Sequence, residues 1–323
     1  MQRRRLLGAL AVSAFLFAPF GARPGDRTWQ STLSRDHPLV GRIWDAGRGR
    51  FVSSAALIES LNGAAFALLG EVHDNPDHHA IQVEVLEALA RTGARRGIVF
   101  EQFDREFEPA LRRLFAGGEP GVEDVANTVN FDRGGWNWDF YRPLVAIALR
   151  YGMPIATGNL SRKAASPIAK HGMSALDPAR VAALRLESAW SAEREEAMRA
   201  IVADGHCGAL PVSALPRMAA AQRVRDATLA QAMLEVAPAG AVLIAGNGHV
   251  RRDLGAPLYL AAAAPDRSCC AVGIIEVQAG RGDPAAYLSA AAVNVRPFDY
   301  VWFTPRRERP DPCLAFQRPP ADK

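Results

Sequence analysis

Short apolar runs recur along this chain and are separated by segments of mixed polarity. Each run has the length of a buried strand, and the segments between several of them carry apolar residues at helical spacing, as Ile81, Val85 and Leu89 do. The runs fall at residues 65–69, 97–101, 153–159, 241–245, 270–277 and 300–303. Because strands that alternate with helices usually pair in parallel, the pattern predicts an α/β fold with a largely parallel sheet flanked by helices.

The helical segments divide the chain into two parts. Between residues 161 and 238 no strand pattern occurs, and two helical runs are predicted, near residues 178–201 and 215–236. We therefore expect an α/β core formed by residues 23–160 and 239–323, with residues 161–238 as a smaller helical insertion or lid. Further helices are predicted at residues 52–60, 76–91 and 105–115, and irregular structure at residues 23–50. From residue 305 onward the chain is expected to be loose.

The first 22 residues have the pattern of an export signal. Three arginines, Arg3 to Arg5, precede an apolar run at residues 6–20 that is too short for a comfortable membrane span. We expect residues 1–22 to direct export to the periplasm or cell envelope, either cleaved near Ala22 or kept as an anchor. Since these arginines are the only charged residues of the segment, the formal net charge falls from +4 to +1 without it. No basic stripe with interleaved aromatic residues occurs, so nucleic acid is not expected as a partner.

The cysteines point to structural roles. There are four, Cys207, Cys269, Cys270 and Cys313, and in an oxidising compartment an even number indicates disulfides, with the pairing left open. No Cys-x-x-Cys motif is present, which argues against a zinc ribbon, a thioredoxin motif and covalently attached haem. We interpret these residues as structural bridges or buried thiols.

Two of the predicted strands run into the same kind of turn. Residues 70–73 and 246–249 both read Gly-x-x-His, and each follows directly after an apolar run. In open α/β sheets, ligands bind beyond the carboxyl ends of the strands. If both strands belong to one parallel sheet, Glu71, His73 and His249 would face each other across one cleft.

Glu71 and Glu101 each end a strand, where an apolar side chain would suit a core. Because burial of an unpaired carboxylate is unfavourable, each is expected to face a cleft, a metal ion or a histidine; alternatively each caps a helix or pairs with an arginine such as Arg105. The imidazoles of His73 and His249 suit zinc, iron or copper and also acid–base catalysis. These two acids and two histidines are the candidate catalytic residues if the protein is a hydrolase.

Three further residues are candidates for ligand contacts. His78 and His79 fall in the first turn of the helix predicted at residues 76–91, where partial positive charge favours anions. Asn247 follows a strand and a glycine, where its amide either orients a ligand or completes the turn.

An aromatic segment surrounds Tyr141, with Trp136 and Trp138 close by in the sequence. A tyrosinate can bind ferric haem iron, and aromatic walls suit a flat apolar ring. The alternative is a core cluster that closes the edge of the sheet. No Gly-x-Ser-x-Gly elbow, Walker loop or dinucleotide-binding fingerprint occurs, which removes the common serine hydrolase and nucleotide-binding patterns.

At these motifs the sequence resembles the ChaN-like haem-binding family. Four segments carry the resemblance in the same order: Gly-Glu-Val-His-Asp-Asn-Pro-Asp-His-His at residues 70–79, Phe-Glu-Gln-Phe-Asp-Arg at 100–105, Trp-Asn-Trp-x-x-Tyr-Arg-Pro-Leu at 136–144, and Ile-Ala-Gly-Asn-Gly-His at 244–249. The family implies a parallel sheet with a smaller helical part and haem held between two subunits, with tyrosine on the iron and histidine or lysine near the propionates. It also implies iron uptake in the bacterial envelope.

Carried over by motif, the haem iron would fall to Tyr141 and the propionates to His78 or His79. Asn247 is added as a further candidate cofactor contact because of its place after a strand and a glycine. The partners implied are haem, an outer-membrane haem receptor system, and a second copy of the chain in a homodimer formed on ligand binding. Many relatives are lipoproteins, whereas no lipid-accepting cysteine follows the apolar segment of this chain.

Two functions of different class follow. The first is an exported haem-binding protein in haem or iron uptake, which the closer resemblance favours. The second is a hydrolase, because the same superfamily is understood to include erythromycin-esterase-like and Tiki-like hydrolases with similar Gly-x-x-His motifs. In the second, Glu71 or His73 would activate water, with or without a divalent metal, while His249 and Glu101 assist.

Overall fold

The computed structural model describes residues 27–188, 190–288 and 294–315, so the predicted export signal at residues 1–22 lies outside the described residues. An eight-stranded sheet with strand order β2-β1-β8-β7-β3-β6-β4-β5 forms the centre of the protein. Its strands are β1 (Ile43–Asp45), β2 (Arg50–Val52), β3 (Phe66–Leu69), β4 (Gly97–Asp104), β5 (Ile155–Asn159), β6 (Ala241–Ile244), β7 (Cys269–Glu276) and β8 (Tyr300–Thr304).

The sheet is largely parallel. Strands β8, β7, β3, β6, β4 and β5 pair in parallel, while β1 is antiparallel to both β8 and β2. The middle strands β3 and β6 are buried at every position, which is why they occur in the sequence as unbroken apolar runs rather than as alternating patterns. The predicted α/β fold is confirmed.

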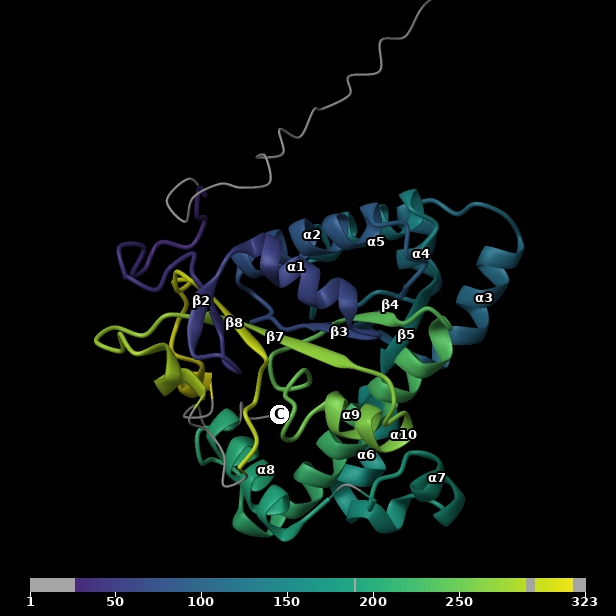
Figure 1. Cartoon of the computed structure of the whole chain (residues 1–323). Helices are drawn as coiled ribbons and strands as arrows, with labels where there is room; N and C mark the ends of the chain where they lie inside the picture. Colours follow the sequence, from purple (N-terminus) through teal and green to yellow (C-terminus); the bar gives the residue numbers. More distant parts are fainter. Residues whose placement is uncertain (1–26, 189, 289–293, 316–323) are drawn as a thin grey trace, which may run out of the picture.

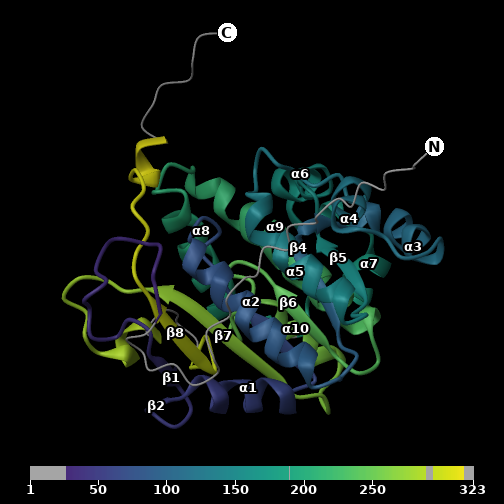
Figure 2. The same ribbon diagram turned by 90° about the horizontal axis from the view of Figure 1, so that it is seen from above.

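Helices cover both faces of the sheet. Figure 1 shows α1, α2, α4 and α5 on one face and α6, α9 and α10 on the other, and in Figure 2 α2 lies along the direction of strand β7. The helices are α1 (Ser54–Gly63), α2 (Pro76–Arg91), α3 (Glu108–Ala116), α4 (Val122–Thr128), α5 (Trp138–Arg150), α6 (Arg162–His171), α7 (Pro178–Ala183), α8 (Ala192–Gly205), α9 (Leu215–Val236) and α10 (Ala256–Ala263). Among the helices that the structure describes, none has the combination of length and apolar composition that a bilayer-spanning helix needs.

The residues at the start of α2 fix where the helix begins. The turn that follows β3 therefore ends at Asn75. The side chain of Asn75 accepts a hydrogen bond from the Asp77 N–H, and Pro76 occupies the first helical turn. The carboxylate of Asp77 accepts hydrogen bonds from the backbone N–H groups of Gln30 and Ser31. Residues 70–75 are therefore held between a strand and a well-capped helix.

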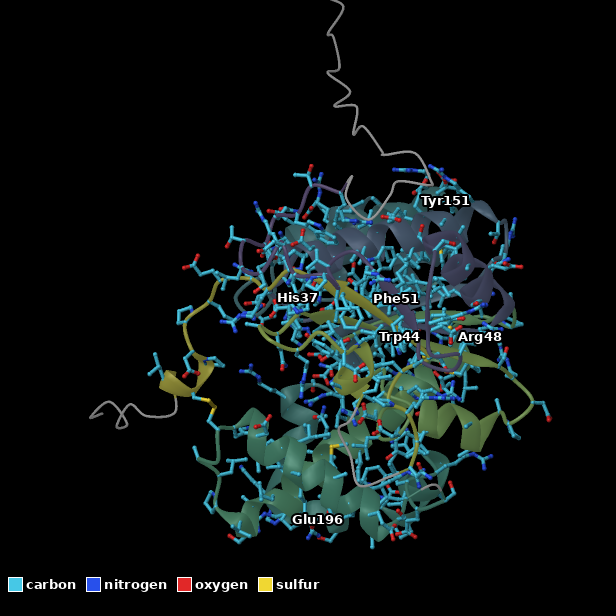
Figure 3. The ribbon with its side chains drawn as sticks, turned by 60° about the vertical axis from the view of Figure 1, so that its left-hand side comes forward. His37, Trp44, Arg48, Phe51, Tyr151 and Glu196 are labelled. Carbon is cyan, nitrogen blue, oxygen red and sulfur yellow. A yellow bond between two sulfur atoms is a disulfide. The ribbon has the colours of Figure 1, made fainter. Side chains whose placement is uncertain are left out.

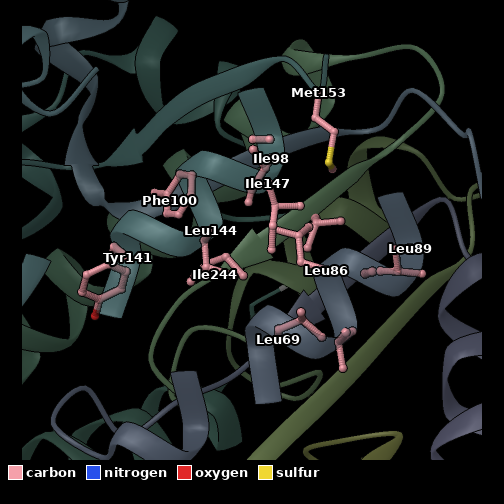
Figure 4. Packing of buried hydrophobic residues seen from close by; sticks show 14 of the residues in the cluster. Leu69, Leu86, Leu89, Ile98, Phe100, Tyr141, Leu144, Ile147, Met153 and Ile244 are labelled. Carbon is pink, nitrogen blue, oxygen red and sulfur yellow. The ribbon is translucent and has the colours of Figure 1, made fainter. Parts of the chain in front are cut away.

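A hydrophobic layer lies on each face of the sheet. In one layer, Leu69 and Ile244 of the sheet pack against Leu86 of α2 and Leu144 of α5, all at most 1% exposed. Figure 4 shows this cluster, with Tyr141 at its end and the tyrosine hydroxyl directed away from the aliphatic side chains. On the other face, α9 supplies residues such as Leu229 to the second layer.

Some expectations of local structure are wrong. Residues 43–50, expected to be irregular, and Val52, expected to begin a helix, belong to the β1–β2 hairpin, in which the rings of Trp44 and Phe51 lie 4.9 Å apart between centroids (Figure 3). Both residues pair within the hairpin, and aromatic cross-strand pairs stabilise such short strands. The run expected at residues 178–201 is split into α7 and α8, because Asp177 and Ser191 each cap a separate helix.

The segment at residues 305–313, which we call the C-terminal clasp, was also expected to be loose. Instead, the guanidinium of Arg309 donates hydrogen bonds to Asp74 and Glu276 at 2.7–2.8 Å. A disulfide joins Cys207, beyond α8, to Cys313 at the end of the clasp, and its yellow bond is visible in Figure 3. The other two cysteines are free thiols.

Candidate functional site

Three adjacent strands, β3, β6 and β4, end side by side at the carboxyl edge of the sheet. In the strand register, Ile244 of β6 pairs with Leu69 of β3 on one side and with Phe100 of β4 on the other. The residues that follow therefore bring Glu71 and Glu101 to either side of the turn after β6. Both acids and both turn histidines meet at this edge.

Glu71 is the centre of a buried hydrogen-bond network. Its side chain is 0% exposed. One carboxylate oxygen accepts hydrogen bonds from the Tyr141 hydroxyl at 2.6 Å, from His73 Nδ1 at 2.9 Å and from the Gln102 amide at 3.3 Å. The other accepts from the Gln82 amide at 2.9 Å. Several donors thus converge on one buried carboxylate, the arrangement that stabilises its charged form.

The charge state of Glu71 follows from these neighbours. Burial raises the pKa of Glu71. The charges of His79 and His73, together with the hydrogen bonds, lower it by a larger amount, so that the pKa lies below its usual value. Glu71 is therefore an anion at neutral pH and acts as a fixed acceptor for His73.

His73 is the open member of the cluster. Its side chain is 45% exposed, and its ring meets Trp136 edge-on at 4.7 Å between centroids. Because Glu71 accepts at Nδ1, Nε2 is the nitrogen left for a ligand, and no described residue hydrogen-bonds to it. Burial lowers the pKa of His73, but the Glu71 hydrogen bond and the Glu101 charge raise it, and the net shift is upward.

The position of His73 depends on a glycine in the facing turn. A Cβ on Gly246 would lie 2.8 Å from His73 Cε1 and 3.0 Å from Nε2. Contacts this short would displace the ring. The glycine of the second Gly-x-x-His turn therefore makes room for the histidine of the first.

Glu101, His249 and Asp226 form a second buried line beside Glu71. His249 Nε2 lies 3.2 Å from Glu101 Oε1, and Nδ1 lies 2.6 Å from Asp226 Oδ1. The backbone N–H of Gly246 donates to Glu101 at 2.7 Å. The His249 side chain is 8% exposed and that of Asp226 is 1% exposed, so this line is nearly closed to solvent.

His249 is positively charged in this arrangement. Burial lowers the pKa of His249, but Glu101 and Asp226 on its two sides raise it to about 10. We assign the compensating negative charge to Glu101, whose pKa is lowered by His249 and the Gly246 N–H despite its burial. Burial raises the pKa of Asp226, and within the described chain its second oxygen has no hydrogen-bond partner.

Tyr141 is not accessible to a haem iron in this structure. It is 0% exposed, and its hydroxyl donates to Glu71. Burial and the charge of Glu71 both raise the pKa of Tyr141 far above its usual value, which disfavours the phenolate that iron binding requires. The other tyrosines, all in the described part of the chain, are also buried or half-buried, and their positions are 151, 259, 287 and 300.

His78 and His79 both have internal partners. His78 Nδ1 accepts from the Val72 N–H at 2.8 Å, and its Nε2 contacts the Thr304 hydroxyl at 2.8 Å. Burial lowers the pKa of His78 to about 3, so this ring is neutral. His79 Nε2 donates to the His73 carbonyl at 3.0 Å, and its ring stacks on Phe140. In this structure neither ring presents a nitrogen to a propionate, and their predicted role is untested.

Asn247 and the tryptophans have structural contacts as well. The amide of Asn247 donates to the Ile274 carbonyl at 2.7 Å and accepts from the Ile274 N–H at 3.2 Å, which joins the second turn to β7. Trp138 packs in the core against Phe131, whereas Trp136 lies against His73. Arg105, considered as a partner for the acids, pairs with Glu235 instead.

Several polar residues of this edge were not singled out in the sequence: Gln82, Gln102, Gln222, Arg225 and Asp226. A signal existed for Asp226, because Leu229 and Met233 follow it one and two turns later on the buried side of α9. An acid in line with such apolar residues needs a buried partner. For the glutamines and Arg225, polar residues on half-exposed helix faces carry no such signal.

In the described residues, no three His, Cys, Asp or Glu side chains are arranged to hold one metal ion. The edge offers instead one half-exposed imidazole fixed by a buried carboxylate and, next to it, a buried imidazolium between two acids. Such a site can bind a metal centre through one nitrogen, or exchange a proton with a ligand.

Comparison with known proteins places this chain in a family. Residues 57–260, more than half of the chain, match the family described as haem-binding uptake, Tiki superfamily, ChaN. The chain belongs to this family. Both Gly-x-x-His turns lie within the residues that match the ChaN family, while β7, β8 and the C-terminal clasp follow after them.

One solved structure supports the fold. The chain is similar to a solved structure described as "Cofacial heme binding to ChaN of Campylobacter jejuni", with a TM-score of 0.65 and 20% identity over 80% of this chain and 95% of that one. A structure of the type III effector HopBA1 matches 77% of this chain and 91% of its own at 14% identity, with a TM-score of only 0.38. None of the curated proteins compared with the sequence matches it.

Proposed function

We propose that this protein is an exported haem-binding protein of haem or iron uptake whose ligand binds at the carboxyl edge of the sheet. Its family, and the cofacial haem of the Campylobacter ChaN structure, support haem as the ligand. One observation carries the site: among the four histidines of this edge, His73 alone is exposed, and a buried carboxylate holds its Nδ1.

The donor chemistry supports His73, rather than Tyr141, as the residue that meets the haem iron. Histidine binds haem iron through a neutral nitrogen, and a carboxylate on the other ring nitrogen fixes the ring and raises its basicity. Glu71 is placed to do this for His73. Tyr141 could become a ligand only if it released Glu71 and lost its proton, against the direction of its pKa shift. Haem bound here would supply the iron and a flat apolar surface.

Titration with hemin tests the proposal. The protein should give a saturable shift of the Soret band, which His73→Ala weakens by more than about tenfold and Glu71→Gln by about tenfold. Tyr141→Phe should retain the shift. His171→Ala, an exposed histidine in α6, is the matched control and should bind as the wild type does. Loss of the shift in Tyr141→Phe with retention in His73→Ala would return the iron to Tyr141.

The buried line of Glu101, His249 and Asp226 favours a second candidate, a hydrolase. A carboxylate–histidine pair such as Glu71–His73 can act as general base on water, and the His249 imidazolium can stabilise developing negative charge. A divalent metal remains an alternative way to activate the water. A hydrolase should turn over ester or peptide substrates, lose turnover in His249→Ala, and bind no haem. Hemin binding that survives His249→Ala without any turnover would exclude this candidate.

Export, an outer-membrane receptor system and a homodimer on ligand binding complete the proposal. Export is tested by locating the full chain in cell fractions with and without residues 1–22. Dimer formation is tested by size-exclusion chromatography with and without hemin. A mass that does not change on saturation with hemin would contradict the dimer.

A further inference from the structure

A chain of side-chain contacts extends from the buried histidine to the outer strand of the edge. Its first link, from Gln222 to His249, is a packing contact, because the charged ring has only donors. Gln222 Nε2 lies 3.3 Å from the ring of His249, and Gln222 Oε1 accepts from Arg225 Nη1 at 2.9 Å. Arg225 Nε donates to Asn159 Oδ1 at 3.1 Å, and Asn159 Nδ2 donates to Asp104 Oδ1 at 2.7 Å. Two residues of α9 are thereby fixed against the ends of β4 and β5.

Arg225 stands out in this chain because it has no ion-pair partner. It is half-buried, and within the described residues no carboxylate lies within ion-pair distance of its guanidinium; Asp104 and Asp226 interact with its charge only from farther away. Its Nε and Nη1 atoms have partners, whereas Nη2 has no hydrogen-bond partner in the described part of the chain. Arg225 Nη2 is not among the buried atoms that lack a partner, so it keeps access to solvent and is available to an anion.

The comparison with nearby arginines supports this interpretation. Arg223, two residues earlier on α9, pairs with Glu195 and lies over the ring of Trp190. Arg105, at the end of β4, pairs with Glu235. Asp226, the acid next to Arg225 in the sequence, already pairs with His249, whose Nδ1 lies 2.6 Å from Asp226 Oδ1. The fixed guanidinium therefore presents one arm at the edge that holds this histidine.

We infer that Arg225 is the anion-binding residue of this site and binds a carboxylate of the ligand. This inference rests on the proposed function, in which the ligand is a porphyrin with two propionates. Arginine suits the role, because its planar fork matches a carboxylate and is always charged. The role would thus fall to α9, and not to the first turn of α2, where His78 and His79 already have protein partners.

The experiment compares protoporphyrin IX with its dimethyl ester, which keeps the ring and lacks both charges. Without iron, the result does not depend on the ligand at His73. Porphyrin binding is followed by quenching of tryptophan fluorescence in the full chain. The wild type should bind the acid about tenfold or more tightly than the ester, as expected for a charge-assisted hydrogen bond. Arg225→Gln should bind both equally, while the affinity for the ester stays as in the wild type.

Two further variants complete the test. Gln222→Glu is isosteric and places a carboxylate on Arg225 Nη1, so it should also abolish the preference for the acid even if Arg225→Gln fails to fold. Arg105→Gln, the matched control, should keep the preference. A preference retained in either Arg225→Gln or Gln222→Glu overturns the inference. If the wild type binds neither hemin nor either porphyrin, the proposed function fails first, and this outcome is distinct from a lost preference.

Discussion

At the scale of single residues, the site depends on two close approaches: Gly246 beneath the His73 ring, and His249 between two acids. Gly246 leaves the space that the His73 ring fills, and His249 fills the space between two carboxylates. A Cβ at position 246 would meet two atoms of the His73 ring at 3.0 Å or less. The first should affect both ligand binding and stability, whereas the second is tested through the pH dependence of stability.

Gly246→Ala should weaken hemin binding by displacing His73. Overpacking of this kind costs about 1–3 kcal/mol in the free energy of unfolding, and the tilted ring should lose its bond to Glu71. Hemin titration and urea unfolding measure the two effects. Gly248→Ala is the control, since a Cβ there has nothing within 4 Å. Unchanged hemin affinity in Gly246→Ala would separate His73 from the binding site.

His249 should make the protein less stable as the pH rises above neutrality. The pKa of its imidazole rises from the ordinary value of 6.5 in the unfolded chain to about 10 in the folded protein. Its contribution is therefore complete below pH 6.5 and is lost as the pH approaches 10, with a limiting slope of about 1.4 kcal/mol per pH unit. Urea unfolding between about pH 7 and pH 9 should show this decline in the wild type and a smaller one in His249→Gln. Equal slopes would mean that His249 is neutral in the folded protein.

At the scale of elements, helix α9 connects the sheet to the site, since it carries Gln222, Arg225 and Asp226 and packs against the second apolar layer. Its last residue, Val236, lies directly over the first residue of β4. A Cβ on Gly97 would be 2.4 Å from Val236 Cγ1. The glycine thus sets the distance between α9 and the sheet, at the end of the helix away from the site.

Gly97→Ala should push α9 away from β4 and lower the free energy of unfolding by about 1–3 kcal/mol. The double variant Gly97→Ala/Val236→Ala removes the clashing methyl groups and should recover part of the loss, which a double-mutant cycle in urea measures. Hemin affinity should fall and recover in parallel, because α9 positions Arg225. Additive losses in the double variant would contradict a direct clash.

The elements were predictable from the sequence to different degrees. Buried strands such as β3 and β6 were found because both of their faces are covered, so their residues form continuous apolar runs. The β1–β2 hairpin was missed, because its strands of three residues carry little periodicity. The two Gly-x-x-His turns and the strand ends identified Glu71, Glu101 and their histidines as neighbours. Asp226 could have been found from its place on the buried side of α9. Arg225 could not, because it is half-buried and its partner Asn159 comes from β5, 66 residues earlier in the chain.

At the scale of the whole molecule, the C-terminal clasp joins parts of the chain that the sequence order keeps apart. It begins after β8, contacts the loop that follows His73 through Arg309 and Asp74, and ends at Cys313 in a disulfide to Cys207 near α8. The helical layer and the carboxyl edge of the sheet are therefore linked by one covalent bond and one cluster of ion pairs. This arrangement agrees with an oxidising compartment, where such a disulfide persists.

Loss of the disulfide should destabilise the protein without removing the clasp from Asp74. The two cysteines are 106 residues apart, and closure of a loop of this length stabilises the folded state by about 2–4 kcal/mol, mainly by restricting the unfolded chain. Cys207→Ser/Cys313→Ser should lower the free energy of unfolding by that amount under oxidising conditions, and reductant should lower the wild type to the same value. Cys269→Ser, which removes a free thiol, is the control, and its free energy of unfolding should still fall when reductant is added. Mass spectrometry should confirm two new thiols in the reduced wild type. If its free energy of unfolding nevertheless stays the same, the clasp is held by Arg309 and its carboxylate partners, Asp74 and Glu276, alone.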